Sequence, residues 1–308
     1  MSANIYTHQN INIWKTWILM ALFFVIVIIL GWFLSIFYGN TSILYIAVLL
    51  AVFMNVFSYW FSDKIVLKIH KAKSINRAEY FDLWNITENL SITAGLPMPR
   101  LYIIEDQAPN AFATGRDKKH AIVCVTTGLL NILNKNELEG VIAHELSHIG
   151  NRDMLLSTIT VVMAGFVALL SDFFLRSQMW GTNRNRDNSG SGVLLIIGLV
   201  LAILTPITAT LIRLAISRKR EFLADASGAL LTRYPEGLAN ALRKISAAPT
   251  EMRTANHATA HLFISNPFGN LKTSKLNNLF MTHPPVEERI RALIQTRDGN
   301  ESRISHFK

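Results

Sequence analysis

Four long apolar runs constrain the fold of this chain more than any other feature. Each has close to the ~20 residues that an α-helix needs to cross ~30 Å of hydrocarbon. They cover residues 17–37, 42–61, 154–175 and 193–212. Half of all residues are hydrophobic, only 17% are charged, and the mean hydropathy is +0.28. The pattern predicts a mainly α membrane protein with four transmembrane helices arranged as two hairpins.

Basic residues predict which side of the membrane the polar segments occupy. Those that follow the second run are Lys64, Lys68, Lys71, Lys73 and Arg77, whereas the turn at 38–41 has no charge. Cytoplasmic flanks are rich in Lys and Arg, so both termini and the polar segments are expected in the cytoplasm. The same bias explains the net charge of +9 without a nucleic-acid partner. The first run is too long for a signal peptide and is expected to remain as an anchor.

The polar segment between the hairpins shows signals of a small domain that contains a β-sheet. Expected elements are a helix at 76–94, strands at 101–104, 110–115 and 121–125, and a short helix at 128–133. The next helix is expected to begin at Asn136, with Glu139 bonding back to the cap, and to stop at Gly150. Asp153 is then expected to cap the helix that follows.

The helix expected between Asn136 and Gly150 contains the motif His-Glu-x-x-His. His144 and His148 are four residues apart, so both imidazoles project from one face and can share a zinc ion. Glu145 is placed to reach a metal-bound water. Cys124, the single cysteine, excludes a cysteine-based zinc site and an internal disulfide, and its apolar surroundings predict a buried thiol.

A catalytic zinc site usually has a third protein ligand. The candidate is Glu221, with Asp225 one turn further, where it can accept the free ring N–H of a ligating histidine. A solvated glutamate in a charge run is equally compatible with the spacing. His257 and His261 share the four-residue spacing, but Ala258 stands where a base is needed, so a surface or core role is favoured. The remaining histidines considered, His70, His120 and His306, are expected to be solvated.

The segments His144–Asp153 (HELSHIGNRD) and Glu221–Asp225 (EFLAD) resemble the motifs of HtpX-type bacterial membrane zinc endopeptidases, relatives of the CAAX prenyl proteases. Two flanking segments agree, PNAFATG at 109–115 and THPP at 282–285 with Glu288-Arg289-Ile290. The resemblance extends from residue 17 to about residue 294. It implies a cytoplasmic zincin-like (gluzincin) metalloprotease domain with one zinc per subunit, and it favours Glu221 as the third ligand.

The resemblance also implies roles for the flanking segments. Asn110, Ala111, Phe112 and Ala113 would form an edge strand that holds an extended substrate by backbone pairing, with an ordinary sheet strand as the alternative. His283 would stabilise an oxyanion or hold a Pro-rich turn. The expected divisions are an N-terminal transmembrane hairpin (1–63), the first part of the protease domain (64–153), a second hairpin (154–212) and the second part (213–308).

The function expected from these features is zinc-dependent cleavage of misfolded or damaged membrane proteins and of unfolded polypeptides, at the cytoplasmic face of the inner membrane. The expected partners are these substrates and the lipid bilayer, with no nucleic acid, and the oligomeric state stays open. An intramembrane zinc site is disfavoured, because charged and polar residues flank the motif helix. The alternatives are a CAAX-type prenyl-peptide protease and a non-catalytic membrane scaffold or metal-binding regulator.

Overall fold

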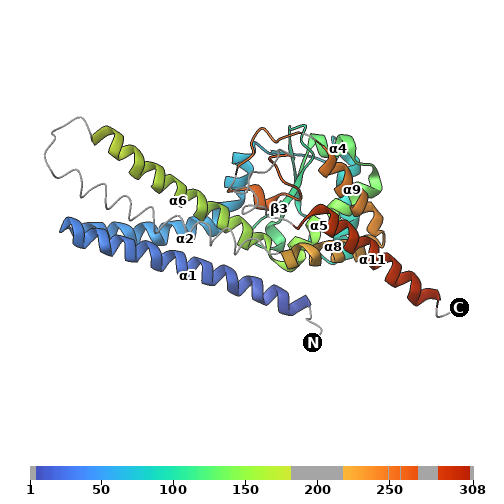
Figure 1. The fold of residues 1–308 in the computed structure, drawn as a ribbon, viewed down its shortest axis with the longest axis horizontal. Coiled ribbons are helices and arrows are strands. Elements are labelled where there is room, and N and C mark those ends of the chain that lie inside the picture. The colour runs from blue at the N-terminus through green and yellow to red at the C-terminus, as the bar shows by residue number, and fades with distance from the viewer. Residues whose placement is uncertain (1–4, 182–217, 249, 257, 270–283, 306–308) are drawn as a thin grey trace.

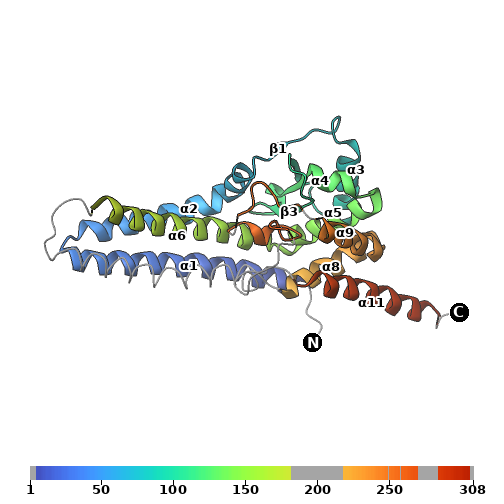
Figure 2. The same ribbon diagram turned by 45° about the horizontal axis from the view of Figure 1, so that its top comes forward.

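The computed structural model describes residues 5–181, 218–248, 250–256, 258–269 and 284–305. It has two parts, a stalk of long apolar helices and a globular domain at one end of the stalk (Figure 1). The N-terminal end of the stalk lies beside the domain (Figure 2). The fold is mostly helical with one small sheet, as the sequence predicts.

The stalk consists of α1 (Ile5–Tyr38), α2 (Ser42–Ile69) and α6 (Met154–Gly181), which pack side by side. Among the described residues, two helices are long and apolar enough to cross a membrane, Ile11–Tyr38 and Ser42–Ile69, with mean hydropathies of 2.9 and 2.0. The third apolar run lies within α6. The fourth, 193–212, falls outside the described residues.

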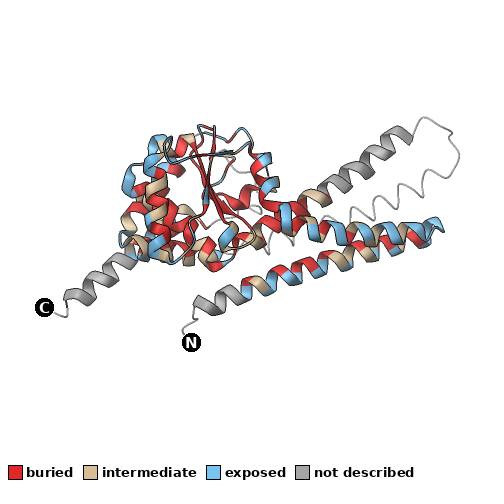
Figure 3. Cartoon of the chain, turned by 180° about the vertical axis from the view of Figure 1, so that it is seen from behind, coloured by how far each residue is buried: buried red, intermediate tan, exposed pale blue. Residues whose placement is uncertain are grey.

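Large apolar side chains on the stalk face outward. Trp32 is 55% exposed, Leu49 70% and Phe53 58%. Figure 3 shows exposed positions along the outer sides of α1 and α2, whereas buried positions gather in the domain. Exposure of so many large apolar side chains to water is unfavourable, and a lipid environment would cover them. Where α1 meets the domain, the buried Asn12 side chain donates to the Asn151 carbonyl (3.1 Å).

The domain is built on a four-stranded sheet of order β1-β2-β4-β3. The strands are β1 (Lys73–Ser74), β2 (Arg100–Ile104), β3 (Ala111–Thr114) and β4 (Ile122–Thr126). Only β2 and β4 are parallel, and β3 forms one edge of the sheet. The three expected strands are confirmed to within a residue or two, and the Cys124 thiol on β4 is buried.

Helices complete the domain. They are α3 (Phe81–Ala94), α4 (Thr127–Ile132), α5 (Lys135–Asn151), α8 (Arg218–Thr232), α9 (Pro235–Ala247) and α11 (Val286–Ser305), with 3-10 turns η1 (Lys118–His120) and η2 (Ala260–Leu262). The main core packs α5 against the sheet, α3, α8 and α9. The expected helix start at Asn76 is wrong, because residues 77–80 form turns before α3 begins.

Both expected boundaries of α5 are also wrong. The N-cap is Asn134, whose side chain accepts from the Glu137 N–H (3.0 Å) while Glu137 accepts from the Asn134 N–H (2.9 Å). Lys244 on α9 pairs with the same glutamate at 2.7 Å, which favours this register over the one that starts at Asn136. At the other end, Gly150 is still helical and Arg152 provides the left-handed cap, with φ 57°.

Candidate metal centre

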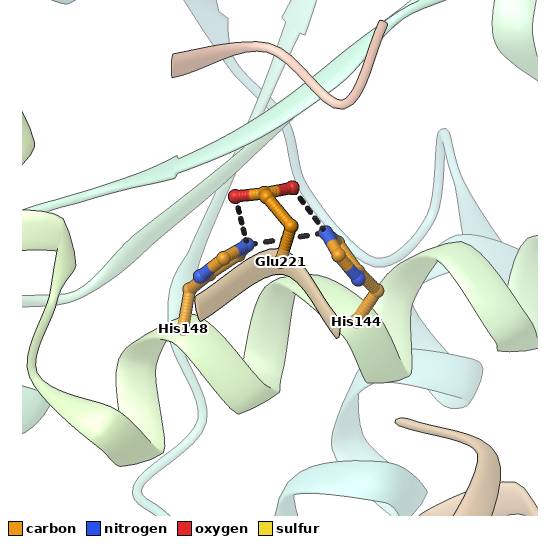
Figure 4. A group of neighbouring side chains, drawn as sticks. All are labelled: His144, His148 and Glu221. Atoms are coloured by element: carbon orange, nitrogen blue, oxygen red, sulfur yellow. Dashed lines mark hydrogen bonds and ion pairs between the residues drawn. The ribbon is translucent and has the colours of Figure 1, made fainter. Parts of the chain in front are cut away.

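The two motif histidines lie on one face of α5 and direct their Nε2 atoms toward each other, 3.1 Å apart. Glu221, in the first turn of α8, places Oε2 3.8 Å from Nε2 of His144 and Oε1 3.7 Å from Nε2 of His148. One ligand atom from each of the three residues lies within 4.8 Å of the others. Figure 4 shows the carboxylate of Glu221 above and between the two imidazoles.

His144 forms the inner side of this centre and is 1% exposed. Its Nδ1 lies 2.9 Å from Oδ1 of Asp225, which comes from the next turn of α8. Arg289 on α11 grips Asp225 with two hydrogen bonds, Nε to Oδ2 (2.8 Å) and Nη2 to Oδ1 (2.7 Å). Burial acts to raise the pKa of Asp225, but Arg289 and His144 hold it at about 2. Burial dominates at His144 and lowers its pKa.

His148 forms the outer side, and its side chain is 17% exposed. Nδ1 of His148 lies 3.2 and 3.1 Å from the two oxygens of Asp153. Burial acts to lower the pKa of His148, but Asp153, Glu221 and Glu145 raise it to about 10. α6 begins directly after Asp153, as expected, and the Asp153 carbonyl accepts from the Ser157 N–H (3.2 Å), but the carboxylate faces His148.

This donor set fits a metal ion. Each histidine has Nδ1 against a carboxylate, the arrangement that fixes Nε2 as the ligand atom. When Nδ1 carries the proton, both Nε2 atoms are acceptors, and two acceptors 3.1 Å apart repel unless a cation lies between them. The carboxylates around His148 supply the negative charge that such a cation needs. Nitrogen and carboxylate ligands from two histidines and one glutamate are typical of catalytic zinc.

Glu145 follows His144 on α5 and is 1% exposed. Burial, together with the charge of Glu221, raises its pKa to about 7 against the opposing effect of His148. A cation bound beside it would act in the opposite direction. A carboxylate poised near neutrality can both accept and return a proton.

α8 packs closely against α5 because a glycine of α8 faces that helix. A Cβ built on Gly228 would lie 3.0 Å from the backbone nitrogen of His144 and 3.2 Å from the carbonyl carbon of Ala143. A side chain at this position would push the two helices apart. Close packing therefore depends on Gly228, one turn beyond Asp225 and two turns beyond Glu221.

The predicted substrate strand corresponds to β3, which packs beside α5 at the edge of the sheet. Its first half is already paired, because the carbonyl of Ala111 accepts from the Ile264 N–H (2.9 Å). The side chain of Asn110 binds Ser265 rather than facing outward (3.0 Å). If a peptide pairs with this edge, it must do so beyond Ala111, toward Ala113 and Thr114.

Of the other histidines, His70 differs from expectation, His261 agrees with it, and three lie outside the described residues. His70 is fully buried, not solvated, with Nδ1 2.9 Å from Oγ1 of Thr254 and its ring against Phe263. His261 is buried, with Nε2 3.1 Å from the Ser157 carbonyl. His257, His283 and His306 fall outside the described residues. Sequence reasoning gave no catalytic-site role to Asp153 or Arg289, although both lie in the quoted motifs.

A histidine pair and glutamate that can hold a metal, with a second glutamate on the motif helix, define the class as metallopeptidase. The model of peptidase family M48 matches residues 78–297, and the chain belongs to this family. It is 48% identical over 295 residues to "Protease HtpX homolog" of Thermoanaerobacter pseudethanolicus, covering 94% of this chain and 97% of that protein. It is 45% identical over 284 residues to the homolog of Campylobacter curvus, covering 92% and 96%.

A looser likeness is to the crystal structure of S. mikatae Ste24p, with a TM-score of 0.48 and 19% identity. It covers 81% of this chain and 57% of that one. The family and the two apolar helices make this protein a membrane metalloprotease that acts on protein substrates.

Proposed function

We propose that this chain is a zinc endopeptidase of the inner membrane that cleaves misfolded or damaged membrane proteins and unfolded polypeptides at the cytoplasmic face. The observation that carries the proposal is the convergence of His144, His148 and Glu221 in one centre that contains a buried Glu145. The match to HtpX homologs supports this protease type over a prenyl-peptide protease.

In this proposal Nε2 of His144, Nε2 of His148 and the carboxylate of Glu221 hold one zinc ion. When bound, zinc acts as a Lewis acid toward the scissile carbonyl and toward water. Asp225 and Asp153 keep the two imidazoles in the tautomer and orientation that leave Nε2 free for the metal.

Glu145 moves the proton. Its carboxylate accepts a proton from the attacking water and then delivers it to the leaving amine. Burial favours its protonated form and a cation bound beside it favours its charged form, and these opposing effects suit it to both steps. The surrounding core, which includes Val141, Ile142 and Leu146 on α5, excludes bulk water from the base of the site.

The proposed topology places both termini and the site in the cytoplasm. It keeps the divisions 1–63 and 154–212 as transmembrane hairpins and 64–153 with 213–308 as one catalytic domain. Two observations support it. The basic residues at 64–77 and 218–220 lie at the domain end of the stalk, as the positive-inside rule requires. The chain also leaves the domain along α6 and is part of the domain again at α8.

Membrane-protein quality control under stress is the proposed role. A site at the base of the stalk lies where an unfolded cytoplasmic loop of a neighbouring membrane protein would be held. Pairing with β3 beyond Ala111 would be tolerant of sequence, because main-chain groups carry most of the affinity.

The decisive experiment compares the wild type with Glu145→Gln, both purified in detergent, for zinc content and cleavage of casein with and without a chelator. We expect both proteins to hold about one zinc per chain and only the wild type to cleave. Near-normal turnover by Glu145→Gln would rule out the proposed proton carrier. Absence of zinc from both proteins would rule out the metal centre.

A further inference from the structure

Arg289 is an arginine with no exposed surface, buried under the metal centre on α11. Burying a guanidinium is costly unless charge and hydrogen bonds compensate it. Its three nitrogens have a partner each, Asp225 for two of them and the carbonyl of Ile264 for the third. Asp225 raises the pKa of Arg289 further above its usual range against the effect of burial, so the side chain is a permanent cation.

The contacts of Arg289 with Asp225 connect it to the proposed metal ligand His144. Two parallel hydrogen bonds fix the plane of the Asp225 carboxylate as a single bond would not. Oδ1 of that carboxylate is also the atom 2.9 Å from Nδ1 of His144. The orientation of the His144 ring thus depends on where Arg289 holds Asp225.

The contact of Arg289 with Ile264 connects it to the edge strand β3. Nη1 of Arg289 donates to the Ile264 carbonyl (3.1 Å), and the Ile264 N–H donates to the Ala111 carbonyl on β3 (2.9 Å). The Asn110 side chain anchors the next residue twice, donating to the Ser265 carbonyl (3.0 Å) and accepting from the Ser265 N–H (3.2 Å). Residues 264 and 265 are therefore held between Arg289 and the start of β3.

We propose that Arg289 is a positioning residue that fixes the metal ligand His144 and the substrate-binding edge β3 relative to each other. Among the residues that the structure describes, this guanidinium alone binds both the Asp225 carboxylate and the segment paired with β3. This inference rests on the proposed function, because it takes β3 as the strand that a substrate pairs with.

A merely structural role for Arg289 predicts a different result. A buried ion pair that only stabilises α11 would lower the unfolding temperature and leave zinc affinity and KM unchanged in the molecules that remain folded. A positioning role requires zinc affinity and KM to change while the protein is folded.

The test uses the full chain in detergent and three variants, Arg289→Met, Arg289→Lys and Arg291→Met. Arg291 is the matched control, because it is an exposed arginine on the same helix. Zinc affinity is measured by competition with a chelating dye in the Glu145→Gln background, which prevents self-cleavage. KM for casein is measured in the active background at saturating zinc, with folding checked by circular dichroism.

We expect Arg289→Met to weaken zinc binding by about tenfold or more, the range seen when groups behind a metal ligand are lost. KM at saturating zinc should rise at least about threefold, because the hydrogen bond from Arg289 to Ile264 beside β3 is lost even when the metal site is filled. Arg289→Lys keeps the charge but not the fork, and should recover part of the zinc affinity. Arg291→Met should match the wild type in both measurements.

Zinc affinity of folded Arg289→Met within about twofold of the Arg291→Met value would overturn the proposal, and so would an unchanged KM at saturating zinc. If Arg289→Met does not fold, Arg289→Lys decides by the same two comparisons. A wild type that binds no zinc would instead contradict the proposed function, so the two failures are distinguishable.

Discussion

The two sides of the metal centre use the same pair of residue types in different surroundings. On the inner side, Asp225 meets His144 and is itself gripped by Arg289, and all three side chains are at most 3% exposed. On the outer side, Asp153 meets His148, which is 17% exposed, and no Lys or Arg pairs with Asp153 in the part of the chain that the structure describes. The inner carboxylate is neutralised and fixed. The outer one keeps its negative charge available to a cation.

The largest effect should come from breaking the inner side. Asp225→Asn removes the partner of a buried guanidinium, which typically costs about 3–5 kcal/mol of stability, and it should weaken zinc binding by about 100-fold. Asp153→Asn should cost about 1 kcal/mol and weaken zinc binding by about tenfold. Zinc titration and urea unfolding in the Glu145→Gln background measure both. Equal losses from the two variants would contradict the asymmetry.

His70 is a buried histidine whose pKa shows what burial does where no carboxylate of the described residues pairs with the ring. Burial lowers the pKa of His70 to about 4, against a small opposing effect of Asp106, whereas the carboxylates raise that of His148 to about 10. Because the folded pKa of His70 is below its unfolded value of 6.5, the unfolded state binds more protons at low pH. The contribution of neutral His70 to the free energy of unfolding is complete above pH 6.5 and is lost as the pH falls toward 4.

The expected loss is up to about 3 kcal/mol of unfolding free energy between pH 7 and 4. The measurement is the difference in pH dependence between the parent protein and His70→Gln, which isolates this group from the other titrating residues. Parallel pH profiles for the two proteins would show that His70 does not titrate with a lowered pKa.

Helix spacing at the inner side gives a smaller effect. Gly228→Ala forces a methyl group to 3.0 Å from the His144 backbone nitrogen and should cost about 1–3 kcal/mol, with weaker zinc binding. Gly150→Ala is the matched control on α5, because its nearest neighbour would be the Leu96 side chain at 3.9 Å. This control should be neutral or slightly stabilising, as alanine favours helix. Similar unfolding midpoints for both variants would show that the close packing of α8 on α5 does not depend on Gly228.

The smallest effect is expected at the surface histidine. Nδ1 of His120 lies 2.7 Å from Asp117, so it repeats the His–Asp pairing of the metal centre, but its side chain is 43% exposed. Water screens such pairs, and His120→Gln should change stability by no more than about 0.5 kcal/mol and leave zinc affinity unchanged. A loss comparable to that of Asp153→Asn would mean that burial does not separate the two pairs.

The sequence was sufficient to predict the features that depend on local pattern. Apolar runs identified α1 and α2, β-branched segments identified three strands, and the His144–His148 spacing placed both imidazoles on one face. These predictions succeed because hydropathy, strand propensity and helical periodicity act over a few residues. The juxtaposition of Glu221 with the histidines, 73 residues beyond His148, depended on resemblance, because spacing alone left a solvated glutamate equally compatible.

The features that sequence reasoning missed depend on tertiary contacts. Asn134 and Asn136 both have a glutamate three residues later, and Lys244 on α9 distinguishes the two registers. His70 sits among lysines in the sequence, yet Phe112 and Phe263 surround it in the fold. Arg289 resembles any basic residue of an amphipathic helix until α11 brings it beneath Asp225. In each case the partner is more than about forty residues away, so no local pattern identifies it.

The distribution of the centre over three helices also determines when the enzyme can become active during its own synthesis. α5 supplies two donors, α8 the third, and α11 the arginine behind them. Arg289 is made 68 residues after Glu221, roughly 3–14 s later at the usual pace of translation. A nascent chain that ends after α5 therefore lacks both Glu221 and Arg289. In the proposed function such a chain lacks the third zinc ligand, so proteolysis begins only after α8 and α11 have been synthesised.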